Sequence, residues 1–139
     1  MGKLFISLSF LLMMTAVHAA PHIIDTLSPN FANRHIMVIT LQKKTKPGVD
    51  ITADEQSWKI MSSAAMEIFK TVKATTETEV SAKFTDMPVF MAGKMRVDDK
   101  QYNYEINAGS FVKLTNTEET LYYACWDKNL KKYFLKGPK

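Results

Sequence analysis

Methionine side chains have the most regular spacing among the residues that could do chemistry, because Met87, Met91 and Met95 recur every four residues. Thioether sulfurs bind soft metals such as Cu(I), and on a helix these three would share one face. Their neighbours, including Pro88 and Gly93, favour a strand, in which four residues span about 13 Å. One ion cannot bridge that distance. We therefore interpret the methionines as adaptable core side chains and expect no metal and no other cofactor.

Two pairs of adjacent carboxylates, at residues 98–99 and 118–119, are the next candidates for chemistry. Adjacent residues on a strand point to opposite faces, so neither pair could share a proton, and we interpret both as turn residues. The sequence has no Gly-x-Ser-x-Gly elbow, no His-Glu-x-x-His, no glycine-rich phosphate loop and no paired cysteines. We therefore predict no catalytic residues and a protein that is not an enzyme.

Cys125 is the only cysteine, so no disulfide can form within the chain. The surrounding segment alternates like a strand, which places Cys125 on one face with Leu121 and Tyr123. A buried, unreactive thiol is the simplest interpretation. Two alternatives stay open: an intermolecular disulfide that would make a dimer, and a reactive thiol, which needs a nearby base or cation to lower its pKa.

Aromatic side chains are concentrated in the last third of the chain. Tyrosine and tryptophan are enriched at binding surfaces because they combine contact area with a polar group, and strands also favour them. In the pairs 122–123 and 133–134, consecutive aromatics on a strand face opposite sides, so one of each pair lies outside a one-sided core. This indicates a partner surface or a second covering layer, such as the N-terminal arm. The candidate binding residues are Tyr102, Tyr104, Tyr122, Tyr123, Trp126 and Tyr133.

The chain has 139 residues and a formal net charge of +4, a length that suits one domain. A nucleic-acid-binding protein usually concentrates its basic residues on one face. Here they are scattered, with modest clusters at residues 43–46 and 128–136. We interpret these lysines as solvated surface rather than as a site for an anionic ligand, and expect no nucleic-acid partner.

The first 19 residues have the pattern of a secretory signal peptide, with Lys3, an apolar run over 4–17 and small residues ending at Ala19. The apolar run is shorter than the roughly 20 residues that a membrane-spanning helix needs. We therefore predict a signal peptide over 1–19, a mobile arm over 20–34 and one domain over 35–139. The mature protein would be periplasmic or extracellular, without a stable membrane anchor.

The periodicity of the remaining chain predicts an α+β domain. Thr52 and Glu55 have the spacing of a capping box, and apolar residues at intervals of three and four extend one helix over 53–73. Alternation and short apolar runs predict strands at 35–41, 80–84, 89–97, 101–106, 111–114 and 121–126, with an edge strand at 132–136. The segment at 35–41 is predicted to be a strand buried on both faces. We expect a single long amphipathic helix packed on a curved antiparallel sheet of four to six strands.

The predicted order β-α-β-β-β-β resembles that of the cystatin fold. Cystatins carry an inhibitory Gln-x-Val-x-Gly hairpin, and in the corresponding run at 89–93 only Gly93 matches. Trp126 resembles the tryptophan of the second cystatin wedge, but Cys125 replaces the proline that usually precedes it. The likeness is therefore one of architecture, which does not determine function.

Three classes of function remain. The first, which we favour, is a small exported protein-binding module that acts as an inhibitor or accessory protein. The second is a carrier of a small apolar ligand between helix and sheet, which predicts a cavity lined by Trp58, Met61, Phe69 and strand aromatics. The third is an enzyme with an unrecognised site, which predicts polar side chains converging in a cleft and shifted pKa values.

Overall fold

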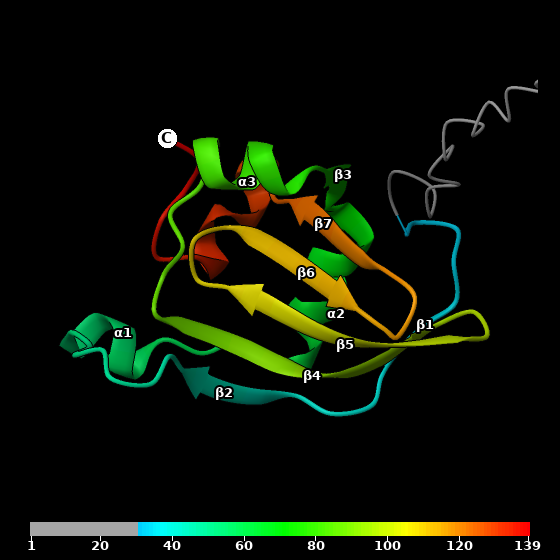
Figure 1. Ribbon diagram of the computed structural model, residues 1–139, viewed down its shortest axis with the longest axis horizontal. Helices are drawn as coiled ribbons and strands as arrows, with labels where there is room; N and C mark the ends of the chain where they lie inside the picture. The colour runs from blue at the N-terminus through cyan, green and yellow to red at the C-terminus, as the bar shows by residue number, and fades with distance from the viewer. Residues whose placement is uncertain (1–30) are drawn as a thin grey trace, which may run out of the picture.

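The computed structural model describes residues 31–139, which form one antiparallel sheet with helices on both faces (Figure 1). The predicted α+β class is confirmed. The predicted signal peptide and residues 20–30 of the predicted arm lie outside the described residues. The elements in chain order are β1 (Ile36–Val38), β2 (Gln42–Thr45), α1 (Ala53–Ser57), α2 (Ser62–Thr71), β3 (Lys73–Thr75), α3 (Glu77–Lys83), β4 (Val89–Val97), β5 (Lys100–Asn107), β6 (Phe111–Thr115), β7 (Thr120–Ala124) and the 3-10 helix η1 (Lys128–Tyr133).

The strands follow the order β1-β4-β5-β6-β7-β3, and β2 pairs with β4 beyond the end of β1. The four strands β4 to β7 are consecutive in the chain and form the predicted meander, with connections at residues 98–99, 108–110 and 116–119. The sheet has seven strands rather than four to six, because β2 and β3 add short strands at its two edges. The segment expected to be buried on both faces supplies only β1, an edge strand with Met37 exposed.

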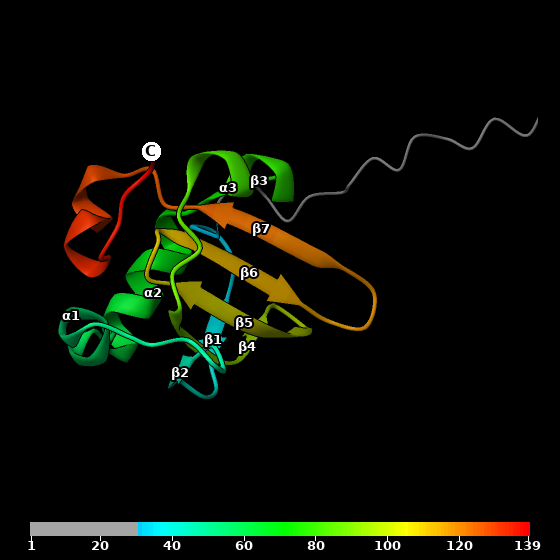
Figure 2. The same cartoon turned by 60° about the vertical axis from the view of Figure 1, so that its left-hand side comes forward.

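The main core lies between α2 and one face of the sheet (Figure 2). From α2, Ile68 and Phe69 are fully buried, and the ring of Phe69 packs edge-on against Tyr104 with the ring centres 5.2 Å apart. Met91 and Met95 project from the same face of β4 into this core. Removing this much apolar surface from water is the main source of stability available to a domain without an internal disulfide.

The predicted single long helix is wrong, because the chain leaves the helical conformation after Ser57 and re-enters it at Ser62. The capping box at the start of α1 is formed as predicted. The extended link buries Trp58, whose indole N–H donates to the backbone oxygen of Tyr133 at 2.8 Å. Met61, expected on the buried stripe, is 64% exposed. Burial of the tryptophan with its hydrogen bond satisfied favours this break over a continuous helix.

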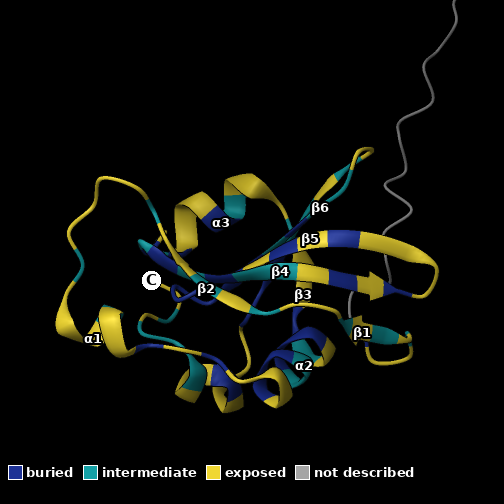
Figure 3. Cartoon of the chain, turned by 90° about the horizontal axis from the view of Figure 1, so that it is seen from below, coloured by how far each residue is buried: buried dark blue, intermediate teal, exposed yellow. Residues whose placement is uncertain are grey.

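Two of the predicted strands do not form. The segment predicted as a strand at 80–84 belongs to α3 and its C-terminal cap, where Val80 and Phe84 lie one helical turn apart. Both side chains are buried against Phe111 and Ala124 on the sheet face opposite α2. Figure 3 shows α2 and α3 on opposite sides of the sheet. The predicted edge strand at 132–136 is also wrong, since η1 and a non-strand segment occupy it.

The residues before β1 pack against the sheet and bond to the turn between β4 and β5. Phe31, in the segment predicted as a mobile arm, is fully buried, with its ring centre 4.8 Å from that of Tyr123. Arg34 forms an ion pair with Asp98, whose carboxylate also accepts from the backbone N–H of His35. The folded part of the chain therefore reaches at least to residue 31. Within residues 31–139, no helix has the length and apolarity needed to cross a membrane.

Replacing Asp98 with asparagine is expected to lower stability at neutral pH. The hydrogen bond from His35, and then the bond from Arg34, holds the pKa of Asp98 below its usual value. The charged carboxylate thus stabilises the fold above its unfolded-state pKa, and this contribution is lost as the pH falls through the lower folded-state value. Asp98 has a φ of 51°, a conformation that asparagine tolerates, so the change isolates the charge.

Thermal unfolding of wild type and Asp98→Asn from pH 7 to pH 2.5 measures this effect. The wild type should melt higher at pH 7, and the difference should narrow below about pH 4. A melting-temperature difference that does not change over this pH range would show that the carboxylate charge of Asp98 does not contribute to stability.

Candidate functional site

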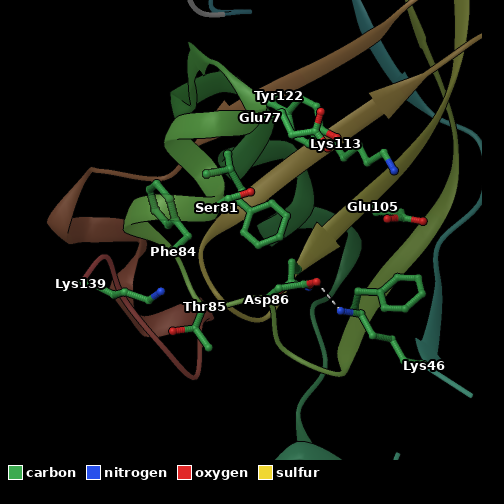
Figure 4. A pocket seen from close by; sticks show the side chains of 14 residues that line it. Lys46, Glu77, Ser81, Phe84, Thr85, Asp86, Glu105, Lys113, Tyr122 and Lys139 are labelled. Carbon is green, nitrogen blue, oxygen red and sulfur yellow. Dashed lines mark hydrogen bonds and ion pairs between the residues drawn. The ribbon is translucent and has the colours of Figure 1, made fainter. Parts of the chain in front are cut away.

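A groove of about 690 Å³ lies between α3 and the sheet face that α2 leaves uncovered (Figure 4). Aromatic side chains line it: Phe84 from the end of α3, and Phe90, Phe111 and Tyr122 from three strands. Phe84 and Phe111 are buried, whereas Phe90 and Tyr122 are half-buried. The groove therefore has an apolar floor accessible from solvent.

The register of the sheet places a polar row beside this floor. Glu105, Lys113 and Tyr122 are successive cross-strand partners on β5, β6 and β7. Directly paired side chains on one face lie close together, so Lys113 is held between a carboxylate and a phenol. Among the described residues, neither Glu105 nor Lys113 forms an ion pair within 4.0 Å. Both charges remain available to a bound molecule.

The rim of the groove carries further charges. Glu77, in the first turn of α3, lies next to Tyr122 in Figure 4. Partial burial raises the pKa of Tyr122, and the hydrogen bond with Glu77 raises it further. On the other side, Lys46 forms an ion pair with Asp86 at 2.5 Å. The rim thus combines both signs of charge and keeps the tyrosine hydroxyl protonated at neutral pH.

The side chain of Asn107 lines the groove and forms hydrogen bonds with the chain segment beside it. Its amide oxygen accepts from the backbone N–H groups of Met87 (3.0 Å) and Gly109 (2.8 Å). Its amide nitrogen donates to the Met87 oxygen and to the Asp86 carboxylate, both at 3.0 Å. This side chain is 4% exposed, and four hydrogen bonds use its full capacity. It therefore sets the position of the segment between α3 and β4 that carries Asp86.

Three of the six candidate binding residues are in the main core. Tyr102, Tyr104 and Tyr123 are each 1% exposed and face α2. The hydroxyl of Tyr102 donates to Glu119 at 2.8 Å, and that of Tyr104 donates to the backbone oxygen of Thr40 at 2.6 Å. A partner that binds the surface of this conformation would not contact these rings.

The other three candidates lie outside that core and apart from one another. Tyr122 lines the groove, while Trp126 is 40% exposed and packs on Phe84 with ring centres 4.8 Å apart. Tyr133 is half-buried in η1 and donates to the carboxylate of Glu67. Of the six candidates, only Tyr122 lines the groove itself, while Trp126 contacts its lining residue Phe84 from outside.

Cys125 is 4% exposed at the end of β7. Burial raises the pKa of its thiol far above the usual value. The thiol is therefore protonated at neutral pH in this conformation, and an intermolecular disulfide would require the surrounding segment to move.

The cystatin-like features have different positions here. Gly93 lies in the middle of β4, paired with Tyr104, and not in a hairpin loop.

Trp58 and Phe69, expected to line a ligand cavity, pack in the main core, while Met61 points away from it. In residues 31–139, no cluster of three or more His, Cys, Asp or Glu side chains is placed to hold a metal ion.

Sequence reasoning missed most of the groove-lining side chains, including Glu77, Phe90, Glu105 and Lys113. A signal was present in β4 to β7, where each residue between two core-facing positions must face the other side. Phe90, Phe111 and Tyr122 are aromatic at such positions.

Comparison of this chain with protein-family models, with curated proteins and with solved structures finds no match.

Proposed function

We propose that this protein is a small exported, non-catalytic protein-binding module whose groove receives an extended segment of a partner protein. The observation that supports this best is the aromatic floor, which remains open to solvent beside two charges without ion-pair partners. Aromatic rings are enriched at the centre of protein-binding surfaces, and polar or charged side chains are typical of the rim around them. The role would be that of an inhibitor or an accessory protein.

The shape and charge of the groove favour a peptide segment over other occupants. Three lysines and three acidic residues line it, so it lacks the single sign of charge that a polyanion requires. The row of Glu105 and Lys113 can pair with both signs of charge on one segment, while Phe90 and Phe111 accept an apolar side chain. The mixed polar and apolar lining also differs from the enclosed apolar cavity of a carrier.

Site-specific photo-crosslinking in the native exported fraction tests this proposal. Ser81 is exposed and lines the groove, whereas Ser63 is exposed on α2, beyond the opposite face of the sheet. A photo-reactive residue at position 81 should crosslink one discrete partner, and the same residue at position 63 should not. Adding Lys113→Glu should reduce the crosslinked product at least about tenfold, because it places two carboxylates opposite each other on the sheet.

Lys70→Glu, an equal charge change on α2, serves as the control and should leave the product unchanged. Equal crosslinking from positions 81 and 63, or a product that persists in Lys113→Glu, would exclude the groove as the binding site. Circular dichroism of each variant checks that the fold is retained.

A further inference from the structure

The segment after β7 has a strong excess of positive charge. From Trp126 to Lys139 the chain has five lysines and a single acidic residue, Asp127. This segment forms η1 and a C-terminal strand-free stretch beside α3 (Figures 1 and 2). The backbone of the stretch is anchored, since the N–H of Leu135 donates to the oxygen of Ala108, and the N–H of Lys139 donates to the oxygen of Lys83. The charges are therefore held on a fixed surface.

Most of this charge has no ion-pair partner among residues 31–139. Lys128, Lys131 and Lys136 are exposed and form no ion pair within 4.0 Å with a described residue. Asp127 is already engaged as the N-cap of η1, where it accepts from the backbone N–H of Asn129 at 2.8 Å. The surface around η1 consequently has a net positive potential that an anionic partner could complement.

Trp126 lies beside two of these lysines, Lys128 and Lys131. With Lys128 and Lys131 it lines a shallow depression of about 290 Å³, and the Lys83 ammonium lies 5.5 Å from the centre of its ring. The indole is 40% exposed, which makes Trp126 one of the few large apolar side chains that the described residues leave open to solvent. We call Trp126 with Lys128 and Lys131 the Trp126 patch. The Lys83 ammonium beside the indole also forms an ion pair with Glu79 at 2.9 Å, so it is not counted as a free charge of the patch.

We propose that the Trp126 patch binds the surface of a bilayer that contains anionic phospholipids, a function separate from that of the groove. Lysines near an anionic bilayer each add to binding, and indole rings prefer the level of the lipid headgroups. Recognition of one discrete carboxylate or phosphate more often uses the paired donors of arginine. The chain has only two arginines, Arg34 and Arg96, and neither is in the patch. The lysines and the indole thus fit a diffuse field of headgroups better than an acidic protein segment.

Vesicle co-sedimentation with the mature protein tests the proposal directly. Vesicles of phosphatidylcholine with 30 to 50% phosphatidylglycerol, roughly the charge density of an anionic bilayer, should bind the protein at low salt, and pure phosphatidylcholine vesicles should not. About 0.5 M salt should release it, because screening weakens attraction to the surface. The double variant Lys128→Glu/Lys131→Glu should bind at least about tenfold more weakly.

The matched control is Lys94→Glu/Lys100→Glu, which makes the same change in net charge on β4 and β5. It should bind within about twofold of wild type, since its lysines lie outside the patch. Trp126 also reports its own environment: its emission should shift to shorter wavelength on anionic vesicles, and Trp126→Phe should lose the shift. The other tryptophan, Trp58, is buried and should not respond.

Failure to bind anionic vesicles at low salt would overturn the proposal, and so would equal loss of binding in the two double variants. Binding to a soluble polyanion such as heparin that is as tight as binding to vesicles, without a shift in Trp126 emission, would assign the patch to an acidic macromolecule instead. None of these results would affect the proposal for the groove, because crosslinking at position 81 is measured without lipid.

Discussion

Replacing Asn107 with alanine is expected to destabilise the protein by about 3–5 kcal/mol. The change leaves the backbone N–H groups of Met87 and Gly109 and the oxygen of Met87 without their side-chain partner in a buried site. Each buried polar group without a partner costs about 1–3 kcal/mol. Urea unfolding followed by circular dichroism measures the loss.

Asn103→Ala is the control for this prediction. Asn103 lies on the same strand and the same face of the sheet as Asn107, but its side chain is exposed. Its replacement should change the free energy of unfolding by no more than about 0.5 kcal/mol. A loss below about 1 kcal/mol for Asn107→Ala would mean that other contacts position the Asp86–Met87 segment.

The same asparagine connects stability with the proposed function. Asp86, which accepts from Asn107, is also the ion-pair partner of Lys46 on the rim of the groove. Loss of the asparagine would release this rim as well as weaken the fold. Crosslinking from Ser81 in Asn107→Ala should therefore fall even under conditions in which most of the protein is folded.

The meander of β4 to β7 could be predicted from the sequence because its information is local. Tyr102, Tyr104 and Ile106 alternate strictly with polar residues, and the turn at Asp98 lies just before this strand. Period-two alternation between short turns leaves one antiparallel arrangement as the simplest solution. The faces assigned from this alternation are those that the structure shows.

The helices could not be placed as well, because their boundaries depend on tertiary contacts. Trp58 interrupts the long helix to reach Tyr133, which is 75 residues away in the chain. Val80 and Phe84 fit a strand by alternation and a helix by their spacing of four. Thr76 and Glu79 decide this case, since the Thr76 side chain caps α3 by accepting from the Glu79 N–H at 3.1 Å. The spacing Thr-x-x-Glu was visible in the sequence and favours a helix.

The sequence predicted that aromatic side chains would lie outside the core, but it did not predict the groove in which they lie. The pair Tyr122-Tyr123 was expected to place one ring outside a one-sided core, and Tyr122 is that ring. The second covering layer is α3, which covers Phe111 and leaves Phe90 half-buried. Because α3 was read as a strand, the groove that it forms with the sheet could not be derived from the sequence.

Replacing Gly93 with alanine is expected to have an effect at least as large as that of Asn107→Ala, because there is no room for a side chain. A Cβ at Gly93 would lie 2.0 Å from the backbone oxygen of Thr40, in the link between β1 and β2. That oxygen is fixed, since it accepts from Tyr104 at 2.6 Å while the Thr40 hydroxyl accepts from the Lys94 N–H at 2.9 Å. We expect the free energy of unfolding to fall by about 4 kcal/mol or more, with β1 and β2 detached from β4.

Gly137→Ala is the matched control for Gly93→Ala, because a Cβ at Gly137 would meet no atom within 4 Å. Its stability should stay within about 0.5 kcal/mol of wild type. Hydrogen exchange separates detachment from global unfolding: in Gly93→Ala the amides of Ile39 and Thr40, which donate to the oxygen of Lys94, should lose protection before those of β5 and β6. Equal protection at both places, or equal stability of the two glycine variants, would show that the β1–β2 link shifts freely and that its contact with Gly93 does not hold the edge of the sheet.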